Sequence, residues 1–265
     1  MHPMLNIAVR AARAAGNIIS RGFENLDDLQ IQQKGTSDYV TKIDREAESA
    51  IIAKIQQSYP NHSFVGEEGG SITNDPEFTW VIDPLDGTTN FIRGIPHFAV
   101  SIALLNKGKL DQAVVFDPIR GELFTASKGA GAQLNGYRIR ASKPKDLSET
   151  VIATAFPFKN KEQFPEASAK FSEVFKLCGD VRRMGSAALD LAYVAAGRYD
   201  GYFEKGLKAW DMAAGELLVR ESGGLNTDYA GNNDPFYAEL QAPGSANGIV
   251  AGSPKVVQNL VKVLK

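Results

Sequence analysis

The sequence predicts an α+β protein built from closely packed parts, and three patterns along the chain support that prediction. Residues 4–24 and 41–58 carry apolar side chains at helical spacing. Residues 98–139 alternate in the manner of antiparallel strands joined by short turns, whereas strands and helices alternate after residue 150. With 265 residues, 43% of them hydrophobic, the chain can bury a large core in one domain or in two packed halves.

The first half is expected to begin with two helices. The inward-facing positions of the first are Met4, Ala8, Ala11, Ala15, Ile18, Ile19 and Phe23. Thr41 is followed three positions later by Asp44, a spacing that resembles a capping box and marks the start of the second helix, which ends at Pro60. A short strand at residues 63–65 then leads directly into Gly66-Glu67-Glu68-Gly69-Gly70, so an acidic pair follows a strand end.

A second acidic pair follows the next apolar run. Trp80-Val81-Ile82 leads into Asp83, Pro84 is expected to end that strand, and Asp86 comes two residues later. Two carboxylates three positions apart at a strand end suit a hard cation with oxygen ligands. The Gly87-Thr88-Thr89 run that follows can turn backbone N–H groups and hydroxyls toward an anion. A cation site beside an anion site is what metal-assisted phosphate chemistry requires.

An antiparallel meander is predicted next, with strands at residues 98–105, 109–116, 122–127, 132–134 and 137–139. Asn135-Gly136 separates the last two strands and is a strong signal for a two-residue hairpin turn. We therefore expect the meander to form the sheet of the first half.

The polar stretch at residues 142–148 is the best candidate for a boundary between the halves. We predict an N-terminal α+β half at residues 1–145, with the antiparallel sheet and the metal site, and a C-terminal α/β half at residues 146–265 that completes the site within one compact two-part domain. Residues 226–247 are the longest irregular stretch and are predicted to form a mobile surface loop.

Composition argues against several classes of protein. The net charge of −2 does not suit a basic nucleic-acid-binding domain. The single cysteine, Cys178, excludes an internal disulfide and fits a reducing compartment. The N-terminus lacks the pattern of a signal peptide, and no apolar run approaches the ~20 residues that span a bilayer. We expect a soluble cytoplasmic protein.

Five acids are candidates for one cation site: Glu67, Glu68, Asp83, Asp86 and Asp211. If they converge in a cleft they need cations, because burying several unpaired carboxylates is very costly. Two or three Mg²⁺ ions would satisfy them. Because such oxygen ligands favour Mg²⁺ over metals that prefer imidazole, His97 is expected to be structural.

Each candidate also has a simpler interpretation that needs no ligand. Asp83 could open a turn with Pro84, Asp211 could be a first-turn acid stabilised by the helix dipole, and Asp44 could only cap its helix. Glu67, Glu68 and Lys34 could be solvated surface residues, and Ser186 could be an N-cap that binds nothing. The order and combination of the motifs favour the functional interpretation.

The motifs together resemble the signature set of the inositol monophosphatase family. The resemblance rests on Gly66-Glu67-Glu68, on D-P-L-D-G-T-T-N-F at residues 83–91 and on W-D-M-A-A-G at residues 210–215. It extends to Lys34-Gly35, to residues 38–44 and to Gly185-Ser186-Ala187-Ala188, and so covers essentially the whole chain, most closely in bacterial members. It implies a layered α-β-α-β-α sandwich shared with fructose-1,6-bisphosphatase.

The resemblance also implies an activity, namely Mg²⁺-dependent, lithium-sensitive hydrolysis of a phosphate monoester by metal-activated water, with inositol-1-phosphate as the first substrate to consider. It implies two to three Mg²⁺ per site. The first would be held by Glu67, Asp83 and the Leu85 carbonyl, the second by Asp83, Asp86 and Asp211, and a weaker third by Glu67, with Glu68 through water. Lys34 is a candidate for supporting the metal site.

The resemblance implies roles for further residues. Thr88 and Asp44 would orient the attacking water, with Glu67 as the third catalytic residue, and the amides of Gly87 and Thr88 would hold the phosphate. Glu204, Ser186 and Ala187 would contact the inositol hydroxyls.

Two alternatives remain open. The same chemistry could act on another sugar or nucleotide phosphate. Some bacterial members of the family are associated with transcription antitermination on ribosomal RNA operons, so the resemblance also implies a possible partner complex of Nus factors and RNA polymerase. Arg182 and Arg183 are candidate interface residues, because paired arginines are favoured in interfaces, although a solvated basic turn is the simpler interpretation. Family members are commonly homodimers.

Overall fold

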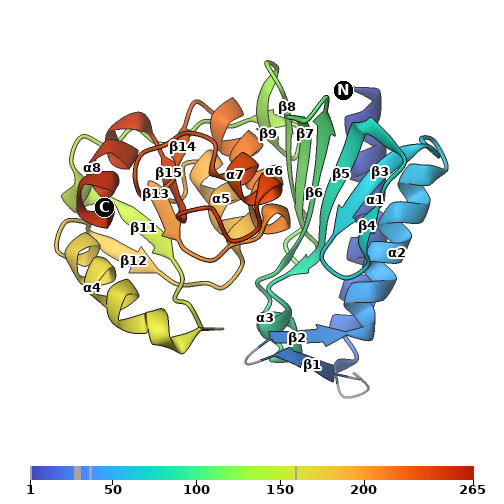
Figure 1. Ribbon diagram of the computed structural model, residues 1–265, viewed down its shortest axis with the longest axis horizontal. Helices are drawn as coiled ribbons and strands as arrows, with labels where there is room; N and C mark the ends of the chain where they lie inside the picture. Colours follow the sequence, from blue (N-terminus) through green and yellow to red (C-terminus); the bar gives the residue numbers. More distant parts are fainter. Residues whose placement is uncertain (1, 27–30, 36–37, 159) are drawn as a thin grey trace.

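Helices and sheets alternate in five layers, as Figure 1 shows: a helix pair, a first sheet, a central helical layer, a second sheet and a further helix pair. In the computed structural model, residues 2–26, 31–35, 38–158 and 160–265 are described, and the side chains of residues 31–40 are left out of the description. The arrangement confirms the predicted α-β-α-β-α fold class.

The first helical layer consists of α1 (Pro3–Phe23) and α2 (Lys42–Gln56), which pack on each other and on the first sheet. In α1 the buried positions recur every three to four residues, as the sequence predicts. In α2, Thr41 is the N-cap and Asp44 completes the capping box. The cap fixes where α2 begins, and therefore where Asp44 lies.

The first sheet has eight strands in the order β10-β9-β8-β7-β6-β5-β3-β4. They are β3 (His62–Gly66), β4 (Gly70–Ile72), β5 (Asp75–Asp86), β6 (Ala99–Asn106), β7 (Lys109–Asp117), β8 (Glu122–Ser127), β9 (Gly131–Leu134) and β10 (Tyr137–Arg138). β3 and β5 run parallel, whereas the other neighbours are antiparallel. Asn135 and Gly136 have φ values of 50° and 83°, which confirms the predicted hairpin turn.

The prediction that Pro84 ends its strand is wrong, because β5 continues to Asp86. Asp83 lies opposite Ser101 and Asp86 opposite Ala99, so the ladder between β5 and β6 changes register between the two acids. A proline is tolerated at such an irregularity, where the backbone N–H leaves the ladder.

Two smaller elements lie at the end of this sheet where β5 finishes. A hairpin of β1 (Ile31–Gly35) and β2 (Asp38–Thr41) precedes α2. The short helix α3 (Thr88–Ile92) follows β5 and contacts β2 (Figure 1). Together they bring the start of α2 beside the end of β5.

The central layer contains α5 (Ala187–Ala195), α6 (Ala209–Glu221) and α7 (Pro235–Gln241). Every residue of α5 is buried, which explains why its sequence has no polar stripe. α5 and α6 approach closely, since a Cβ built on Gly215 would lie 2.6 Å from Leu191 Cβ. This packing fixes the starts of both helices, at Ser186 and Lys208.

The second sheet has the strand order β12-β11-β13-β15-β14. Its strands are β11 (Val151–Thr154), β12 (Asp180–Arg182), β13 (Gly201–Glu204), β14 (Leu225–Thr227) and β15 (Ile249–Gly252), with α4 (Phe164–Phe175) and α8 (Pro254–Leu264) on the outer face (Figure 1). The chain passes from the first sheet to the second between Arg138 and Val151, and the division at residue 145 stays a prediction of domain organisation. Among the described helices, none is long and apolar enough to cross a membrane.

The prediction of a mobile, irregular loop at residues 226–247 is wrong. This stretch contains the end of β14 and all of α7, and the Phe236 side chain is completely buried. Pro235 starts α7 at a position where proline's missing N–H costs no helical hydrogen bond. The buried carboxylate of Glu216 accepts a hydrogen bond from Phe236 N at 2.7 Å, so α7 is anchored to α6.

Candidate active site

Asp83 is a buried acid of the candidate site, with 1% of its surface exposed. Burial raises the pKa of Asp83 well above its ordinary value, and the charges of Glu67, Asp86 and Asp211 raise it further. The structure therefore brings together four of the five acids that the sequence singles out. Asp83 Oδ1 accepts the backbone N–H of Leu85 at 3.0 Å, which holds the turn toward Asp86.

The pairing of β3 with β5 explains why Glu67 lies beside Asp83. The strands are parallel, with Gly66 opposite Ile82. The next residues, Glu67 and Asp83, therefore lie at the same edge of the sheet. Glu67 N donates to the Ile82 carbonyl at 3.2 Å and continues the ladder by one residue. Residues 16 positions apart in the sequence thus become neighbours through register alone.

Asp86 joins the two halves of the chain. Its Oδ2 accepts the Ser186 hydroxyl at 2.6 Å and the Ala188 backbone N–H at 2.7 Å. Ser186 is the N-cap of α5, so the carboxylate faces the positive end of that helix. Ser186 is therefore an N-cap, and its hydroxyl also contacts an acid of the candidate site.

Asp211 lies in the first turn of α6, where its Oδ2 accepts the backbone N–H of Lys208 at 2.6 Å. Asp211 is therefore a first-turn acid of its helix, as the simpler interpretation predicts. Its charge nevertheless raises the pKa values of both Asp83 and Glu204, which places it between the two sheets at the site.

Asp44 and Thr88 are in direct contact. The Thr88 hydroxyl lies 3.1 Å from Asp44 Oδ1 and 3.1 Å from the Leu85 carbonyl, and its one proton can be donated to either. Asp44 Oδ2 accepts Thr41 N at 2.8 Å and the Thr41 hydroxyl at 2.5 Å, so a different oxygen caps α2. Burial raises the pKa of Asp44, the hydrogen bonds from Thr41 oppose that rise, and the charge of Glu68 adds to it.

Gly87 connects β5 to α3 with φ of 98°, a conformation that favours glycine. A Cβ at this position would lie 3.1 Å from the His97 carbonyl and 3.3 Å from the Gly185 carbonyl. The backbone can therefore turn here, between the two halves, only without a side chain. The amides of Gly87 and Thr88 lead into the N-terminus of α3, where backbone N–H groups have no partner within the helix.

Glu204 ends β13 and is buried beside the site. Burial raises its pKa to about 8, the hydrogen bond from Tyr202 opposes the rise, and the charges of Asp211 and Asp86 add to it. The Tyr202 hydroxyl donates to Glu204 Oε2, which fixes the carboxyl orientation. Ala187 lies at the start of α5, directly after Ser186.

The two candidate interface arginines lie in different surroundings. Arg182 is partly exposed on β12 and pairs with Asp180 at 2.6 Å. Arg183 lies 5.5 Å from the centre of the Phe158 ring, and its charge opposes the rise in the pKa of Glu204 that burial causes. The side chain of Lys34 lies outside the described residues.

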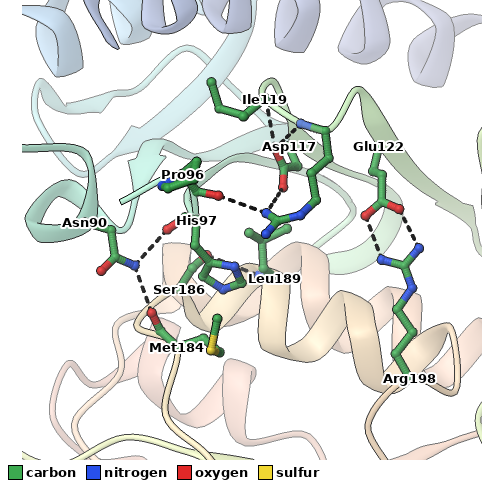
Figure 2. A network of polar contacts seen from close by, with 11 residues as sticks. Asn90, Pro96, His97, Asp117, Ile119, Glu122, Met184, Ser186, Leu189 and Arg198 are labelled. Atoms are coloured by element: carbon green, nitrogen blue, oxygen red, sulfur yellow. Dashed lines mark hydrogen bonds and ion pairs between the residues drawn. The ribbon is translucent and has the colours of Figure 1, made fainter. Parts of the chain in front are cut away.

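Sequence reasoning missed Asn90, Asp190 and Glu48. Asn90 Nδ2 donates to the carbonyls of His97 and Met184 at 2.8 Å each, and Figure 2 shows this bridge between α3 and the segment that leads to Ser186. Asp190 is 1% exposed. Its burial raises its pKa well above the ordinary value, and the charge of Glu204 raises it further. For Asn90, the one available sequence signal was its position inside the motif D-G-T-T-N-F.

His97 is buried, and its backbone carbonyl accepts a hydrogen bond from Asn90 in the network of Figure 2. Burial is the main cause that lowers the pKa of His97 to about 4, and the charge of Arg120 lowers it further. The imidazole is therefore neutral near pH 7. Arg120 pairs with Asp117 at 2.9 Å and Arg198 pairs with Glu122, so ion pairs fix the interface around it. No contact places His97 in the acid cluster.

The chemistry of the donor set fits Mg²⁺. Among the described residues, no group of three or more histidine, cysteine, aspartate or glutamate side chains is placed closely enough to hold a metal ion. The carboxylates nevertheless lie close enough to raise the pKa of Asp83, and such crowding of hard anionic oxygens is what divalent cations relieve. The set includes no imidazole or thiolate that would favour a softer metal.

Comparisons with known proteins match this chain over almost its whole length. The model of the inositol monophosphatase family matches residues 1–264. Nus factor SuhB of Escherichia coli (strain K12) is 54% identical over 262 residues, which cover 98% of this chain and 95% of that protein. The crystal structure of extragenic suppressor protein SuhB from Bartonella henselae has a TM-score of 0.94 at 42% identity, covering 100% of this chain and 99% of that one. The inositol monophosphatase of Anabaena (Nostoc) has a TM-score of 0.84 at 36% identity, with coverages of 98% and 94%.

Proposed function

The chain belongs to the inositol monophosphatase family, and on that premise we propose that it is a Mg²⁺-dependent phosphomonoesterase that converts inositol-1-phosphate to myo-inositol and phosphate. The observation that carries the proposal is the convergence of Glu67, Asp86 and Asp211 on the buried Asp83. A cluster of this charge suits cations, and the first turn of α3 beside it suits an anion.

In this proposal the acids hold two to three Mg²⁺ ions. Glu67, Asp83 and the Leu85 carbonyl would hold the first. Asp83, Asp86 and Asp211 would hold the second, and Glu67 with Glu68 would hold a weaker third. When bound, Mg²⁺ supplies charge neutralisation for the phosphate and makes a water molecule acidic enough to attack near neutral pH.

The chain's own residues then position water and phosphate. The Thr88 hydroxyl donates its proton to Asp44 Oδ1, which leaves the Thr88 oxygen to accept a hydrogen bond from the attacking water. The amides of Gly87 and Thr88 hold the phosphate oxygens in line with that water. Because Asp44 Oδ2 is fixed by Thr41, the orienting pair is held rigidly.

The polyol pocket of the proposal lies across the interface between the sheets. Glu204, with one oxygen fixed by Tyr202, faces the sugar hydroxyls, and Ser186 and Ala187 form the adjoining wall at the start of α5.

A substrate panel tests the proposal. Purified protein should release phosphate from inositol-1-phosphate in the presence of Mg²⁺ and lose that activity in EDTA. Fructose-1,6-bisphosphate, a nucleotide 3′-phosphate and simple sugar phosphates in the same panel decide whether another ester is preferred. Absence of metal-dependent release from every ester would refute the proposal.

Similarity to proteins named Nus factor SuhB favours a second function, in transcription antitermination with Nus factors and RNA polymerase. Arg182, partly exposed on the edge strand β12, is the proposed contact. An inactive Asp86→Asn protein should still capture these partners, whereas Arg182→Ala should reduce capture and keep hydrolysis. Failure of the unmodified protein to capture either partner would refute this role. Light scattering tests the accompanying proposal of a homodimer.

A further inference from the structure

Glu48 is a buried acid with no place in the mechanism above. It lies on the inner face of α2 and is only 3% exposed. Its Oε2 accepts the backbone N–H of Glu68 at 3.1 Å, and its Oε1 accepts that of Gly69 at 2.5 Å. One carboxylate thus binds two successive amides of the turn between β3 and β4, 20 and 21 residues further along the chain.

This turn carries Glu67. On its N-terminal side, Glu67 is held by its own amide, which donates to the Ile82 carbonyl at 3.2 Å. On its C-terminal side the next two amides are held by Glu48. The backbone of Glu67 is therefore fixed from both directions.

The glycines of the turn make room for this carboxylate. A Cβ at Gly66 would lie 2.3 Å from Glu48 Oε2, and one at Gly69 would lie 2.5 Å from Oε1. Gly70 differs, since a Cβ there would meet nothing within 4 Å and its φ of 73° alone favours glycine. Gly66 and Gly69 thus accommodate the carboxylate, whereas Gly70 serves the turn of the backbone.

The spacing along α2 links this contact to the rest of the site. Asp44 and Glu48 are four residues apart, so they lie on the same face of the helix. Asp44 contacts Thr88, and Glu48 contacts the turn that carries Glu67. One face of one helix therefore sets the distance between the water-orienting pair and the first metal ligand.

We propose that Glu48 is a positioning residue that fixes the Glu67 turn through the amides of Glu68 and Gly69 and thereby sets the affinity of the first Mg²⁺ site. The inference rests on the proposed function for the identity of the metal. It predicts that loss of the carboxylate loosens the turn before any metal is added, and that added Mg²⁺ compensates.

Three proteins test the inference: the unmodified chain, Glu48→Gln, and Glu46→Gln as the matched control. Glu46 lies on the exposed face of the same helix, where it pairs with Lys42. Hydrogen exchange of peptides covering residues 64–72, in the absence of metal, should be at least several-fold faster in Glu48→Gln only. Mg²⁺ binding measured by calorimetry should weaken by roughly 10–100-fold, the range for residues that orient metal ligands. kcat at saturating Mg²⁺ should return to within about threefold of the unmodified value.

The outcomes separate the two proposals. If the unmodified protein binds Mg²⁺ and Glu48→Gln binds it equally well with unchanged exchange at residues 64–72, the role of Glu48 is refuted and the proposed function stands. If the unmodified protein binds no Mg²⁺, the proposed function and the metal role of Glu48 both fail. Should Glu48→Gln not fold, Gly69→Ala intrudes on the same carboxylate and must give the same loosening and weakened binding; normal values there would refute the inference.

Discussion

The Ser186 hydroxyl donates a hydrogen bond to Asp86 Oδ2 at 2.6 Å, although the two residues are 100 positions apart in the chain. Asp86 ends β5 of the first sheet, and Ser186 begins α5 of the central layer. The same oxygen accepts Ala188 N at 2.7 Å, so one carboxylate both caps a helix and faces the acid cluster. Through this contact, residues from both the first sheet and the central helical layer form the site.

Asp86→Asn should abolish most activity and leave the fold intact. The amide keeps an oxygen for Ser186 and Ala188 but loses the charge that holds a cation. Metal catalysis is worth several kcal/mol, so kcat/KM should fall by roughly 100-fold or more. Steady-state kinetics measures the loss of activity, and a melting curve shows whether the fold is intact. Asp146→Asn, on an exposed turn, is the control. A fully active Asp86→Asn protein would contradict the assignment of the second metal site.

Thr88→Val should lower kcat by about 10²–10⁴-fold, the usual contribution of a positioned proton donor or acceptor. The substitution keeps the shape of the side chain but removes the hydroxyl that bonds to Asp44. Thr88→Ser keeps the hydroxyl and should retain activity within about tenfold. Calorimetry should show that Mg²⁺ binding survives in Thr88→Val. Equal rates for the valine and serine variants would show that the hydroxyl has no role.

Gly215→Ala should destabilise the protein, although alanine favours helices by about 1 kcal/mol. The added Cβ would crowd Leu191 Cδ1, Cβ and Cγ, all within 3.0 Å, and push α6 away from α5; two of these three atoms are absent from alanine. Overpacking of this kind costs roughly 1–3 kcal/mol. Urea unfolding measures the loss, and Leu191→Ala in the same chain should recover part of it through non-additivity. A neutral or stabilising Gly215→Ala would mean that the two helices can separate freely.

Stability should depend on pH through Glu216. Burial raises its pKa from 4.5 to about 8; the hydrogen bond from Phe236 N opposes the rise, and Arg220, 3.6 Å from Oε2, offsets only part of it. Between these pH values the folded state holds a proton that the unfolded state has released. The contribution of Glu216 is therefore full below pH 4.5 and falls as pH rises toward 8.

Glu216→Gln removes this titration while keeping an oxygen for Phe236 N. The free energy of unfolding of the unmodified protein, relative to the variant, should fall between pH 5 and pH 8 by an amount on the order of a few kcal/mol. Urea unfolding at several pH values measures it, with Glu173→Gln, an exposed pair partner of Lys176, as the control. Parallel pH profiles for the unmodified protein and Glu216→Gln would show that Glu216 is already ionised in the fold.

Much of the fold could be predicted from the sequence because its signals are local. The capping box at Thr41 and Asp44 marks the start of α2, and Asn135-Gly136 marks the β9–β10 hairpin. The two errors arose where tertiary context decides. Pro84 is accommodated by a change of register that depends on β6, and α7 is only seven residues long and is held by Glu216.

The candidate site could be predicted only as a set of residue types. The neighbouring positions of Glu67 and Asp83 follow from strand register, which the sequence does not show. The side chains of Asn90 and Glu48 form hydrogen bonds with backbone atoms of distant segments. A sequence motif does not indicate which backbone carbonyl or amide such a side chain contacts. A four-residue spacing from Asp44 was the one sequence signal for Glu48.

A crystal structure of the protein soaked with Mg²⁺ and phosphate tests the proposed site around Asp83 most directly. We expect Mg²⁺ at about 2.0–2.1 Å from carboxylate oxygens, with Asp83 contacting two ions. We also expect phosphate oxygens on the amides of Gly87 and Thr88. Mg²⁺ and phosphate bound elsewhere, with Asp83 contacting neither, would contradict the proposed site.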